Sequence, residues 1–240
     1  MSPGPGSCAM MGTANSMSVI AEAMGVTLPG CAAAHAVMGK KNRIARESGK
    51  RIVYLVENNI LPRDIVTQEM LELATKVGVS VGGSTNITLH LPAIAKEGHL
   101  HMTLKEIGEI SDNTPYLAKI KPSGDHTLWD FDQAGGVTAV LKALSEITNI
   151  NLMTLNGKTH LQNTFELVQW DQSVIHPVNN PYASHGSIKV LHGNLAPNGC
   201  VVKQSAVVPE MRKHVGPARC FNSEEEAVSA IYGKQVKRGM

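Results

Sequence analysis

The sequence predicts an α/β fold in which helices cover a parallel-sheet layer, followed by the beginning of a second, β-rich domain. Three observations predict it. Amphipathic helical segments alternate with short β-branched runs, glycine and proline separate these segments, and from about Ser184 the helical periodicity gives way to short strand candidates. We expect residues 1–183 to be part of an N-terminal α/β domain and residues 184–240 to be the incomplete start of a C-terminal β domain.

Apolar residues recur at helical spacing in several segments of the first domain. The first segment ends at Gly25, and Thr67 is placed to cap a later helix that would stop at Gly78. Thr103 and Glu106 have the spacing of a capping box. The expected helices are 13–24, 44–59, 68–77, 87–97, a short one after Thr103, and 137–144.

The short β-branched run at 79–81 and the segment 116–120 are the expected strands of the first domain. The first run meets Gly82 and Gly83, which predicts a strand, a glycine turn and a helix in succession. In the second domain, strands are expected at 187–191, 200–203 and 218–221. Ser223 and Glu226 predict a capped helix over 224–232 that ends at Gly233.

The composition limits the classes of function. The 240 residues include 22 Lys and Arg against 20 Asp and Glu, and 42% of them are hydrophobic, so a packed and nearly neutral globular protein is expected. Scattered aromatics, 4% of the chain, argue against nucleic acid as a partner. No apolar run is long enough for a membrane span, and the N-terminus lacks the features of a secretory signal. We expect a cytoplasmic, reducing compartment.

Cys8 lies on a glycine-rich loop just before the first predicted helix. Free backbone N–H groups and the helix dipole favour a thiolate there, which is either a nucleophile or a metal ligand; a packed loop cysteine is the structural alternative. Cys31, Cys200 and Cys220 lie far apart, and no C-x-x-C pair is present.

The turn that contains Ser84, Thr85 and Asn86 opens a helix after two glycines. Free N–H groups at such a start can hold an anionic group, while a tight turn capped by Ser84 is the structural alternative. His99 and His101 are expected to be solvated, and Asp130 and Asp132 to flank a turn or cap a helix.

Several stretches together resemble the dihydroxy-acid dehydratase family, which also contains 6-phosphogluconate dehydratase and several sugar-acid dehydratases. In order, the matching stretches are GPGSCAMMGTANSM at 4–17, GGSTN at 82–86 with LHL at 89–91, KPSG at 121–124, AGGV at 134–137, and GNLAPNG at 193–199. Residues 193–197 and 201–203 are more similar to the branched-chain amino-acid enzyme, with the sugar-acid dehydratases as the alternative.

The resemblance implies a dehydratase that carries an iron-sulfur cluster, of two or four irons, and Mg²⁺, and that converts a small 2,3-dihydroxy acid to a 2-keto acid. Cys8 matches one of three cysteine ligands of the cluster, with one iron left open to bind the leaving hydroxyl. Ser84, Thr85 and Asn86 are candidates for substrate contact or structural support. Family members are commonly homodimers.

The chain also departs from the family pattern. In the family, the other two cluster cysteines, the magnesium-binding Asp and the carbamylated Lys lie upstream of the loop that corresponds to residues 4–12 here. We call this loop, which carries Cys8, the cysteine loop. A further acidic ligand and the serine base lie downstream, in a C-terminal β-barrel. None of these residues is present, so no catalytic base is identified, and the chain resembles the middle of a family member. We therefore expect a fragment of a dihydroxy-acid dehydratase that is inactive alone, with a truncated non-catalytic remnant as the alternative.

Overall fold

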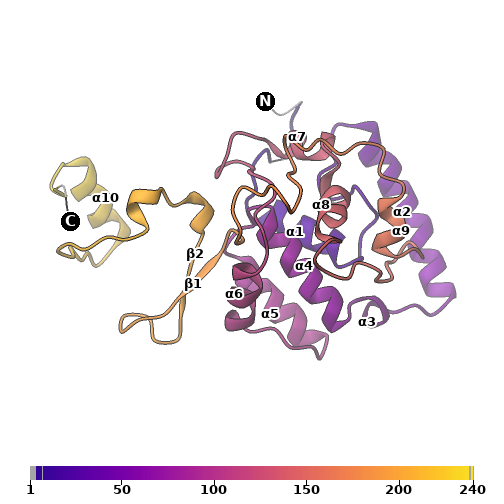
Figure 1. Cartoon of the computed structure of the whole chain (residues 1–240), viewed down its shortest axis with the longest axis horizontal. Coiled ribbons are helices and arrows are strands. Elements are labelled where there is room, and N and C mark those ends of the chain that lie inside the picture. The colour runs from indigo at the N-terminus through magenta and orange to yellow at the C-terminus, as the bar shows by residue number, and fades with distance from the viewer. Residues whose placement is uncertain (1–3, 7, 238, 240) are drawn as a thin grey trace. The chain divides into compact units, whose positions relative to one another are not determined.

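The computed structural model describes residues 4–6, 8–237 and 239. The chain divides into two compact units, residues 1–206 and 207–240 (Figure 1). The predicted domains, 1–183 and 184–240, stay a prediction. No helix in the described part of the chain is both long and apolar enough to cross a membrane.

The first unit is built mainly from helices. In chain order these are α1 (Thr13–Ala23), α2 (Gly39–Glu57), α3 (Pro62–Ile65), α4 (Gln68–Ser80), α5 (Ile87–Glu97), α6 (Leu104–Asp112), α7 (Leu128–Gln133), α8 (Gly136–Leu144) and α9 (His160–Thr164), with a 3-10 turn at Gln204–Ala206. The second unit contains a 3-10 turn at Pro209–Met211 and the helix α10 (Glu224–Tyr232).

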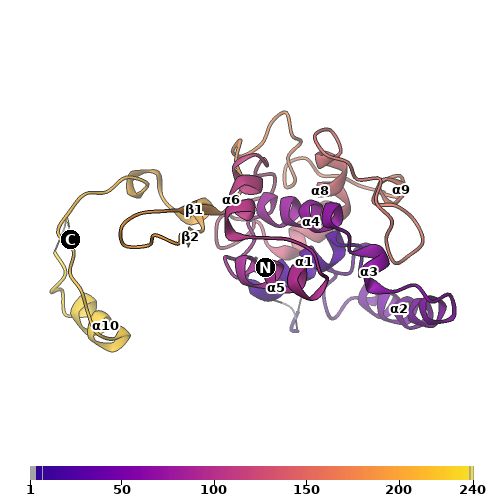
Figure 2. The ribbon, with the colours of Figure 1, turned by 90° about the horizontal axis from the view of Figure 1, so that it is seen from below.

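Helix α4 forms the centre of the first unit. It contacts α1, α5, α6 and α8, and Figure 2 shows it running through the middle of the unit. Leu71, Leu73 and Val77 of α4 are buried in one continuous apolar core that also takes in Ile20 from α1 and Val140 from α8. Burial of these side chains, each worth about 1.5–3 kcal/mol relative to exposure, is what holds the helices together.

The regular sheet of the first unit is small. Strand β1 (Lys189–Leu191) pairs antiparallel with β2 (Cys200–Val202), with Val190 opposite Val201. The expected strand at 116–120 is extended, but among the described residues it forms only single bridges: Tyr116 with Ala183, Ala118 with Ile175, and Ile120 with His126. The structure is therefore mixed, with helices and a two-stranded sheet, while the parallel-sheet layer and the β-barrel stay predictions.

The prediction of a strand at 79–81 is wrong, because α4 continues through Ser80 and Val81 is its C-cap. Gly78 does not end the helix. A Cβ there would lie 3.2 Å from the Ile20 side chain, so the glycine lets α1 approach α4 closely. Val79 and Val81 are fully buried. A short apolar run that is buried on all sides carries no periodicity to separate helix from strand.

Several helix ends occur where the sequence predicts them. The Thr67 hydroxyl accepts a hydrogen bond from the Met70 N–H, and Thr103 and Glu106 form the predicted capping box. Helix α10 has the predicted bounds, with Ser223 as its N-cap. The strand expected at 218–221 is wrong: the segment is irregular and largely exposed, with no strand in the described part of its unit to pair with.

Candidate functional site

Stretches that carry the family resemblance meet around the N-terminus of α1. The Met11 N–H donates to the Lys121 carbonyl oxygen at 2.8 Å, which joins the cysteine loop to the KPSG stretch. The Ser84 N–H donates to the Ser16 hydroxyl, also at 2.8 Å, which joins the GGSTN turn to α1. Segments that lie far apart in the sequence are therefore brought to one place by hydrogen bonds.

The glycines of the GGSTN turn are required by close contacts. Gly82 has a φ of +77°, which an L side chain rarely adopts, and a Cβ there would lie 3.0 Å from the Tyr116 hydroxyl. A Cβ on Gly83 would lie only 2.7 Å from the Gly78 carbonyl oxygen, which also accepts the Gly83 N–H at 3.0 Å. The turn is therefore tied to the end of α4.

Ser84 and Asn86 use their side chains to hold α1. The Asn86 Nδ2 donates to the Thr13 hydroxyl at 2.6 Å and to the Ser84 hydroxyl at 3.2 Å, and the two hydroxyl groups lie 3.3 Å apart. Thr85 differs, because its half-buried hydroxyl makes no hydrogen bond with the described residues. Of the three candidates for substrate contact, Thr85 is the one whose side chain has unused hydrogen-bonding capacity.

Cys8 is exposed on the loop ahead of α1. The helix begins at Thr13 with Gly12 as its N-cap, so Cys8 is not at the helix terminus itself. The Asn15 amide holds the loop by donating to the Cys8 carbonyl oxygen at 2.9 Å and to the Met10 carbonyl oxygen at 2.6 Å. The backbone of Cys8 is thus fixed to the first turn of α1, while its thiol is accessible.

The described residues alone do not fit an iron-sulfur cluster or a Mg²⁺ site. No group of three or more His, Cys, Asp or Glu side chains in this part of the chain is arranged to hold a metal ion. Cys31 is half-exposed and Cys200 is exposed, and neither joins Cys8 in such a group. Cys8 therefore supplies one ligand at most, and the remaining ligands of such a centre have to come from other residues.

Lys203 is a residue near this site that spacing does not single out. It follows β2, and its Nζ donates to the Met11 carbonyl oxygen over a long 3.4 Å, three residues from Cys8. Burial lowers the pKa of this ammonium below its usual value. Its signals in the sequence are its place at the end of the stretch 201–203, which carries part of the family resemblance, and its position directly after an apolar strand, which is common at surfaces. Its position beside the loop that carries Cys8 becomes visible only in the fold.

Hydroxyl side chains gather where Ser205, two residues after Lys203, meets the KPSG stretch. The Ser205 and Ser123 hydroxyl oxygens are 3.2 Å apart, which joins the chain after β2 to the KPSG stretch. Tyr116 is almost fully buried, and burial raises its pKa to about 12, while Ser205 and Ser123 offset part of that rise. The Tyr116 phenol is therefore neutral at physiological pH and a potential hydrogen-bond donor.

The remaining candidate side chains are exposed or are used within the fold, and Asp132 has a role that the sequence did not predict. His99 and His101 are exposed. Asp130 forms a capping box with Thr127 at the start of α7, and its hydrogen bonds to Thr127 lower its pKa. Asp132 forms an ion pair with Lys40 at 2.6 Å. These groups are used within the fold and do not form a site.

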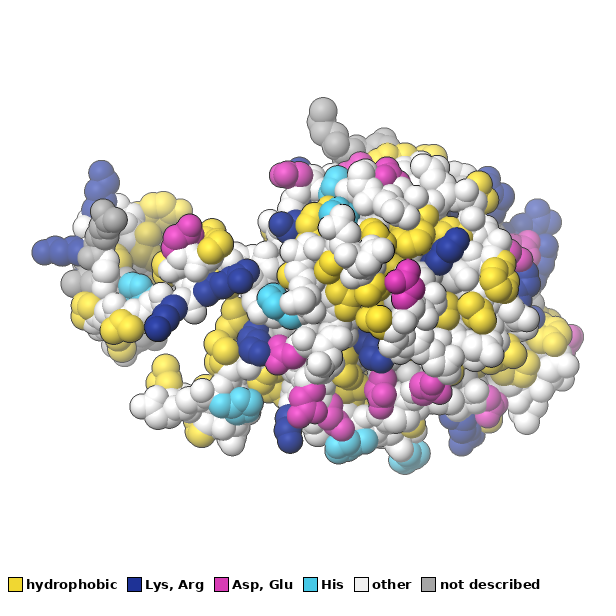
Figure 3. Space-filling model, in the orientation of Figure 1, with side chains coloured by type: hydrophobic (Ala, Val, Ile, Leu, Met, Phe, Trp, Pro, Cys, Tyr) yellow, Lys and Arg dark blue, Asp and Glu magenta, His cyan; other side chains and the backbone are white. Residues whose placement is uncertain are grey.

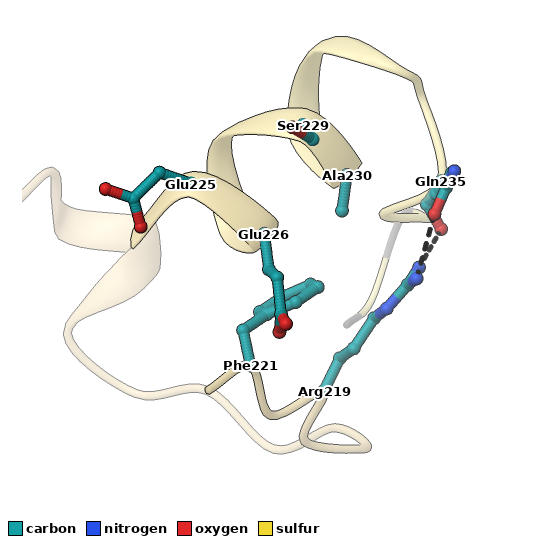
Figure 4. Close-up of a pocket in the computed structure, with 7 residues that line it drawn as sticks. All are labelled: Arg219, Phe221, Glu225, Glu226, Ser229, Ala230 and Gln235. Atoms are coloured by element: carbon teal, nitrogen blue, oxygen red, sulfur yellow. Dashed lines mark hydrogen bonds between the residues drawn. The ribbon is translucent and has the colours of Figure 1, made fainter. Parts of the chain in front are cut away.

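The second unit has a hollow of its own, shown in Figure 4, with a volume of about 420 Å³. Arg219 lines one side of it and donates to the Gln235 carbonyl oxygen at 2.6 Å and to its side-chain oxygen at 3.1 Å, with the guanidinium 5.2 Å from the Phe221 ring centre. Because the guanidinium already binds Gln235 within the unit, we assign the hollow no ligand.

Comparison with known proteins covers nearly the whole chain. Residues 1–163 match the model of the dihydroxy-acid/6-phosphogluconate dehydratase N-terminal domain, and residues 173–240 match that of the C-terminal domain. The two matches follow each other in the order of the family.

Three curated relatives illustrate the similarity. A dihydroxy-acid dehydratase of Methanosarcina barkeri is 49% identical over 240 residues, which cover 98% of this chain and 43% of the relative. Dihydroxy-acid dehydratases of Methanothermobacter thermautotrophicus and Moorella thermoacetica are 47% and 46% identical, each over 99% of this chain and 43% of the relative. The chain thus spans less than half the length of these relatives. With both family models matched and three of the family's stretches joined at α1 by hydrogen bonds, the chain belongs to the dihydroxy-acid/6-phosphogluconate dehydratase family.

Proposed function

We propose that this chain is part of a dihydroxy-acid dehydratase, a hydro-lyase of branched-chain amino-acid synthesis. The observation that carries the proposal is 49% identity over 240 residues to a protein of that name. The expected reaction converts 2,3-dihydroxy-3-methylbutanoate to 3-methyl-2-oxobutanoate. The hydrogen on C2 and the hydroxyl on C3 leave as water, and the resulting enol becomes the ketone.

Two roles follow for residues of this chain. Cys8 is proposed as one ligand of an iron-sulfur cluster, because its thiol is exposed on a loop whose backbone Asn15 fixes. Thr85 is proposed to contact the substrate, because its hydroxyl has no partner among the described residues, whereas Ser84 and Asn86 position α1. The ligands of Mg²⁺ and the other ligands of the cluster would come from residues outside those that the structure describes.

The finer expectations about the complete protein belong to the same proposal. A parallel-sheet layer, a C-terminal β-barrel and a homodimer are implied by the family resemblance. The small β1–β2 sheet near the end of the first unit is compatible with a β domain that begins in this part of the chain.

A chimaeric enzyme tests the proposal directly. Residues 1–240 would replace the equivalent 43% of the Methanosarcina barkeri relative, so that the remaining parts of the family's machinery are supplied by that protein. We expect the chimaera, reconstituted anaerobically with iron and sulfide, to absorb visible light as an iron-sulfur protein and to release 3-methyl-2-oxobutanoate. Substitution of Cys8 by Ala should remove both signals, and the matched substitution Cys31→Ala should remove neither.

The outcome also separates the alternatives. A chimaera that turns over 6-phosphogluconate in preference to the branched-chain substrate would favour a sugar-acid dehydratase. A folded chimaera that holds the cluster but dehydrates neither compound would contradict the proposal and support a non-catalytic remnant. Retention of the cluster in the Cys8→Ala variant would contradict the proposal that this thiol is a cluster ligand.

A further inference from the structure

Cys31 and Lys41 are in contact between the segment after α1 and the start of α2. The Lys41 Nζ lies 3.7 Å from the Cys31 Sγ and donates to the Cys31 carbonyl oxygen at 2.8 Å. Both side chains are half-buried. Figure 3 shows Lys and Arg side chains gathered over α2, at the right of the view. Of the six in this helix, Lys41 is the one that contacts a thiol in the described part of the chain.

A buried carboxylate fixes the backbone on both sides of Cys31. Glu22 is 3% exposed, and its two carboxylate oxygens accept the N–H groups of Gly30 and Ala32, each at 2.8 Å. These hydrogen bonds hold the residues before and after the cysteine. The thiol therefore has a fixed position, and the long side chain of Lys41 is free to move the short distance toward it.

A hollow of about 280 Å³ opens at this pair of residues. It is lined by Cys31 and Lys41, by Thr27, and by residues of α1. The Thr27 hydroxyl oxygen is buried and has no hydrogen-bond partner among the described residues, so it can donate to an oxygen atom that is brought to the thiol. Hydrogen peroxide is little larger than water, which needs only about 10–15 Å³. The hollow therefore admits a small oxidant to Cys31.

Oxidation of the thiol places an oxygen atom next to the lysine. Hydrogen peroxide converts a thiol to a sulfenic acid, whose oxygen is bonded to the sulfur. An ammonium group beside it attracts the partial negative charge of that oxygen. Because 3.7 Å separates Sγ from Nζ, a bridge of one oxygen atom requires less movement than a direct bond between sulfur and nitrogen. We propose that Cys31 and Lys41 form a redox-controlled cross-link in which one oxygen atom joins Sγ to Nζ.

The reaction balances with two molecules of hydrogen peroxide. The first oxidises the Cys31 thiol to the sulfenic acid and leaves as one water. The second removes one hydrogen from the sulfenic acid and one from the Lys41 amine while the oxygen–nitrogen bond forms, and it leaves as two waters. Sulfur and nitrogen are oxidised and the peroxide is reduced. In total, the protein gains one oxygen and loses two hydrogens.

The cross-link restrains a segment that supports the cysteine loop. Ala36 lies between the two linked residues, and a Cβ on Gly6 would lie 3.0 Å from its side chain, so the loop packs against this segment. Cys31 and Lys41 contact each other within the chain. The proposal therefore depends neither on what covers the outer surface of α2 nor on the dehydratase activity.

Mass spectrometry of tryptic peptides tests the proposal. The 240-residue chain is treated with limiting hydrogen peroxide and digested without a reductant. No Lys or Arg precedes Lys40, so residues 1–40 form one peptide, and trypsin releases a linked Lys41 within residues 41–43. We expect these two peptides to be joined, with a mass about 14 Da above their sum, because one oxygen is gained and two hydrogens are lost. Dithiothreitol should separate them again.

Substitutions identify the two atoms that are linked. Cys31→Ser and Lys41→Arg should each abolish the joined peptides. Lys41→Arg keeps the positive charge, so dimedone should still label a sulfenic acid at Cys31 in this variant. Cys8→Ser and Lys40→Arg are the matched controls and should keep the link: Cys8 lies in the same peptide, and Lys40 is the adjacent lysine but pairs with Asp132 at 2.6 Å. Circular dichroism should show the same helix content for all four variants.

Two results would overturn the proposal. Peptide 1–40 could remain separate from residues 41–43, whether or not Cys31 gains oxygen, which would show that no bond to Lys41 forms. The joined peptides could also persist in Lys41→Arg or disappear in Cys8→Ser, which would place the bond on another pair of residues.

Discussion

The hydroxyl of Ser16, on α1, accepts a hydrogen bond of 2.8 Å from the backbone N–H of Ser84, 68 residues further along the chain. The same hydroxyl donates to the Gly12 carbonyl oxygen at 2.7 Å, and Ser16 is fully buried. One side chain therefore joins the cysteine loop, α1 and the GGSTN turn.

Removal of this link should destabilise the fold. We expect Ser16→Ala to lower the free energy of unfolding by about 1–3 kcal/mol, because the Ser84 N–H then loses its acceptor inside the protein. Urea denaturation at neutral pH measures the change. Ser18→Ala, two residues away on α1, should change stability by less than about 0.5 kcal/mol; an equal loss in both variants would contradict the role of the hydrogen bond.

Thr13 and Asn86 should be energetically coupled. A double-mutant cycle with Thr13→Ala and Asn86→Ala is expected to give a coupling energy of about 0.5–1.5 kcal/mol, since the two side chains share a hydrogen bond of 2.6 Å. The control cycle combines Thr13→Ala with Thr159→Ala at the N-cap of α9 and should be additive within about 0.5 kcal/mol. Additivity in the first cycle would argue against the contact.

Gly83 should tolerate no side chain. In Gly83→Ala the new methyl group would lie 2.7 Å from the Gly78 carbonyl oxygen, so the backbone has to shift, at a cost of about 1–3 kcal/mol in the free energy of unfolding. Gly49→Ala is the control, because Gly49 lies within α2 and no atom lies within 4 Å of the added carbon. It should be unchanged or up to about 1 kcal/mol more stable. Thermal or urea unfolding of both variants decides between these outcomes.

His160 should make the fold sensitive to mild acid. Burial lowers the pKa of this side chain below its ordinary value of 6.5, although the bond of its Nε2 to the Ala23 carbonyl oxygen opposes the shift. The unfolded chain therefore binds a proton more readily than the folded chain as the pH falls through 6.5. Stability is expected to be full above that pH and to decline below it, by at most about 1.4 kcal/mol per pH unit.

Comparison with His160→Gln isolates this contribution. The glutamine amide can still donate to Ala23 but does not titrate, so the difference in unfolding free energy between the original chain and the variant should shrink as the pH is lowered from 7.5 to 5.5. A difference that stays constant over this range would show that His160 is not the group responsible.

Thr85 should affect substrate binding in the chimaeric enzyme. Thr85→Val is expected to raise KM for the dihydroxy acid about 2- to 10-fold, because the loss of one hydrogen bond costs about 0.5–1.5 kcal/mol. Thr85→Ser keeps the hydroxyl and should keep KM. If both variants behave like the original, Thr85 does not touch the substrate.

Local signals in the sequence were sufficient for many helix ends. Thr103 with Glu106 and the cap at Ser223 occur where their spacing predicts them, because a capping hydrogen bond involves residues only three positions apart. The same local signals failed at residues 79–81. There the β-branched residues are buried by contacts from all sides, and α4 continues past a glycine that is needed for close packing against Ile20.

The sequence alone was enough for the family, the longer helices, the position of Cys8 on a loop and the glycine turn at Ser84; the short helices α3, α7 and α9 were not predicted. The tertiary structure decided which of these residues act on one another: Ser84 and Asn86 are committed to α1, Thr85 is left open, and Lys203 lies beside the cysteine loop. The physical reason is that these hydrogen bonds join segments tens of residues apart. Their geometry depends on how α1 packs on α4, and no local spacing encodes it.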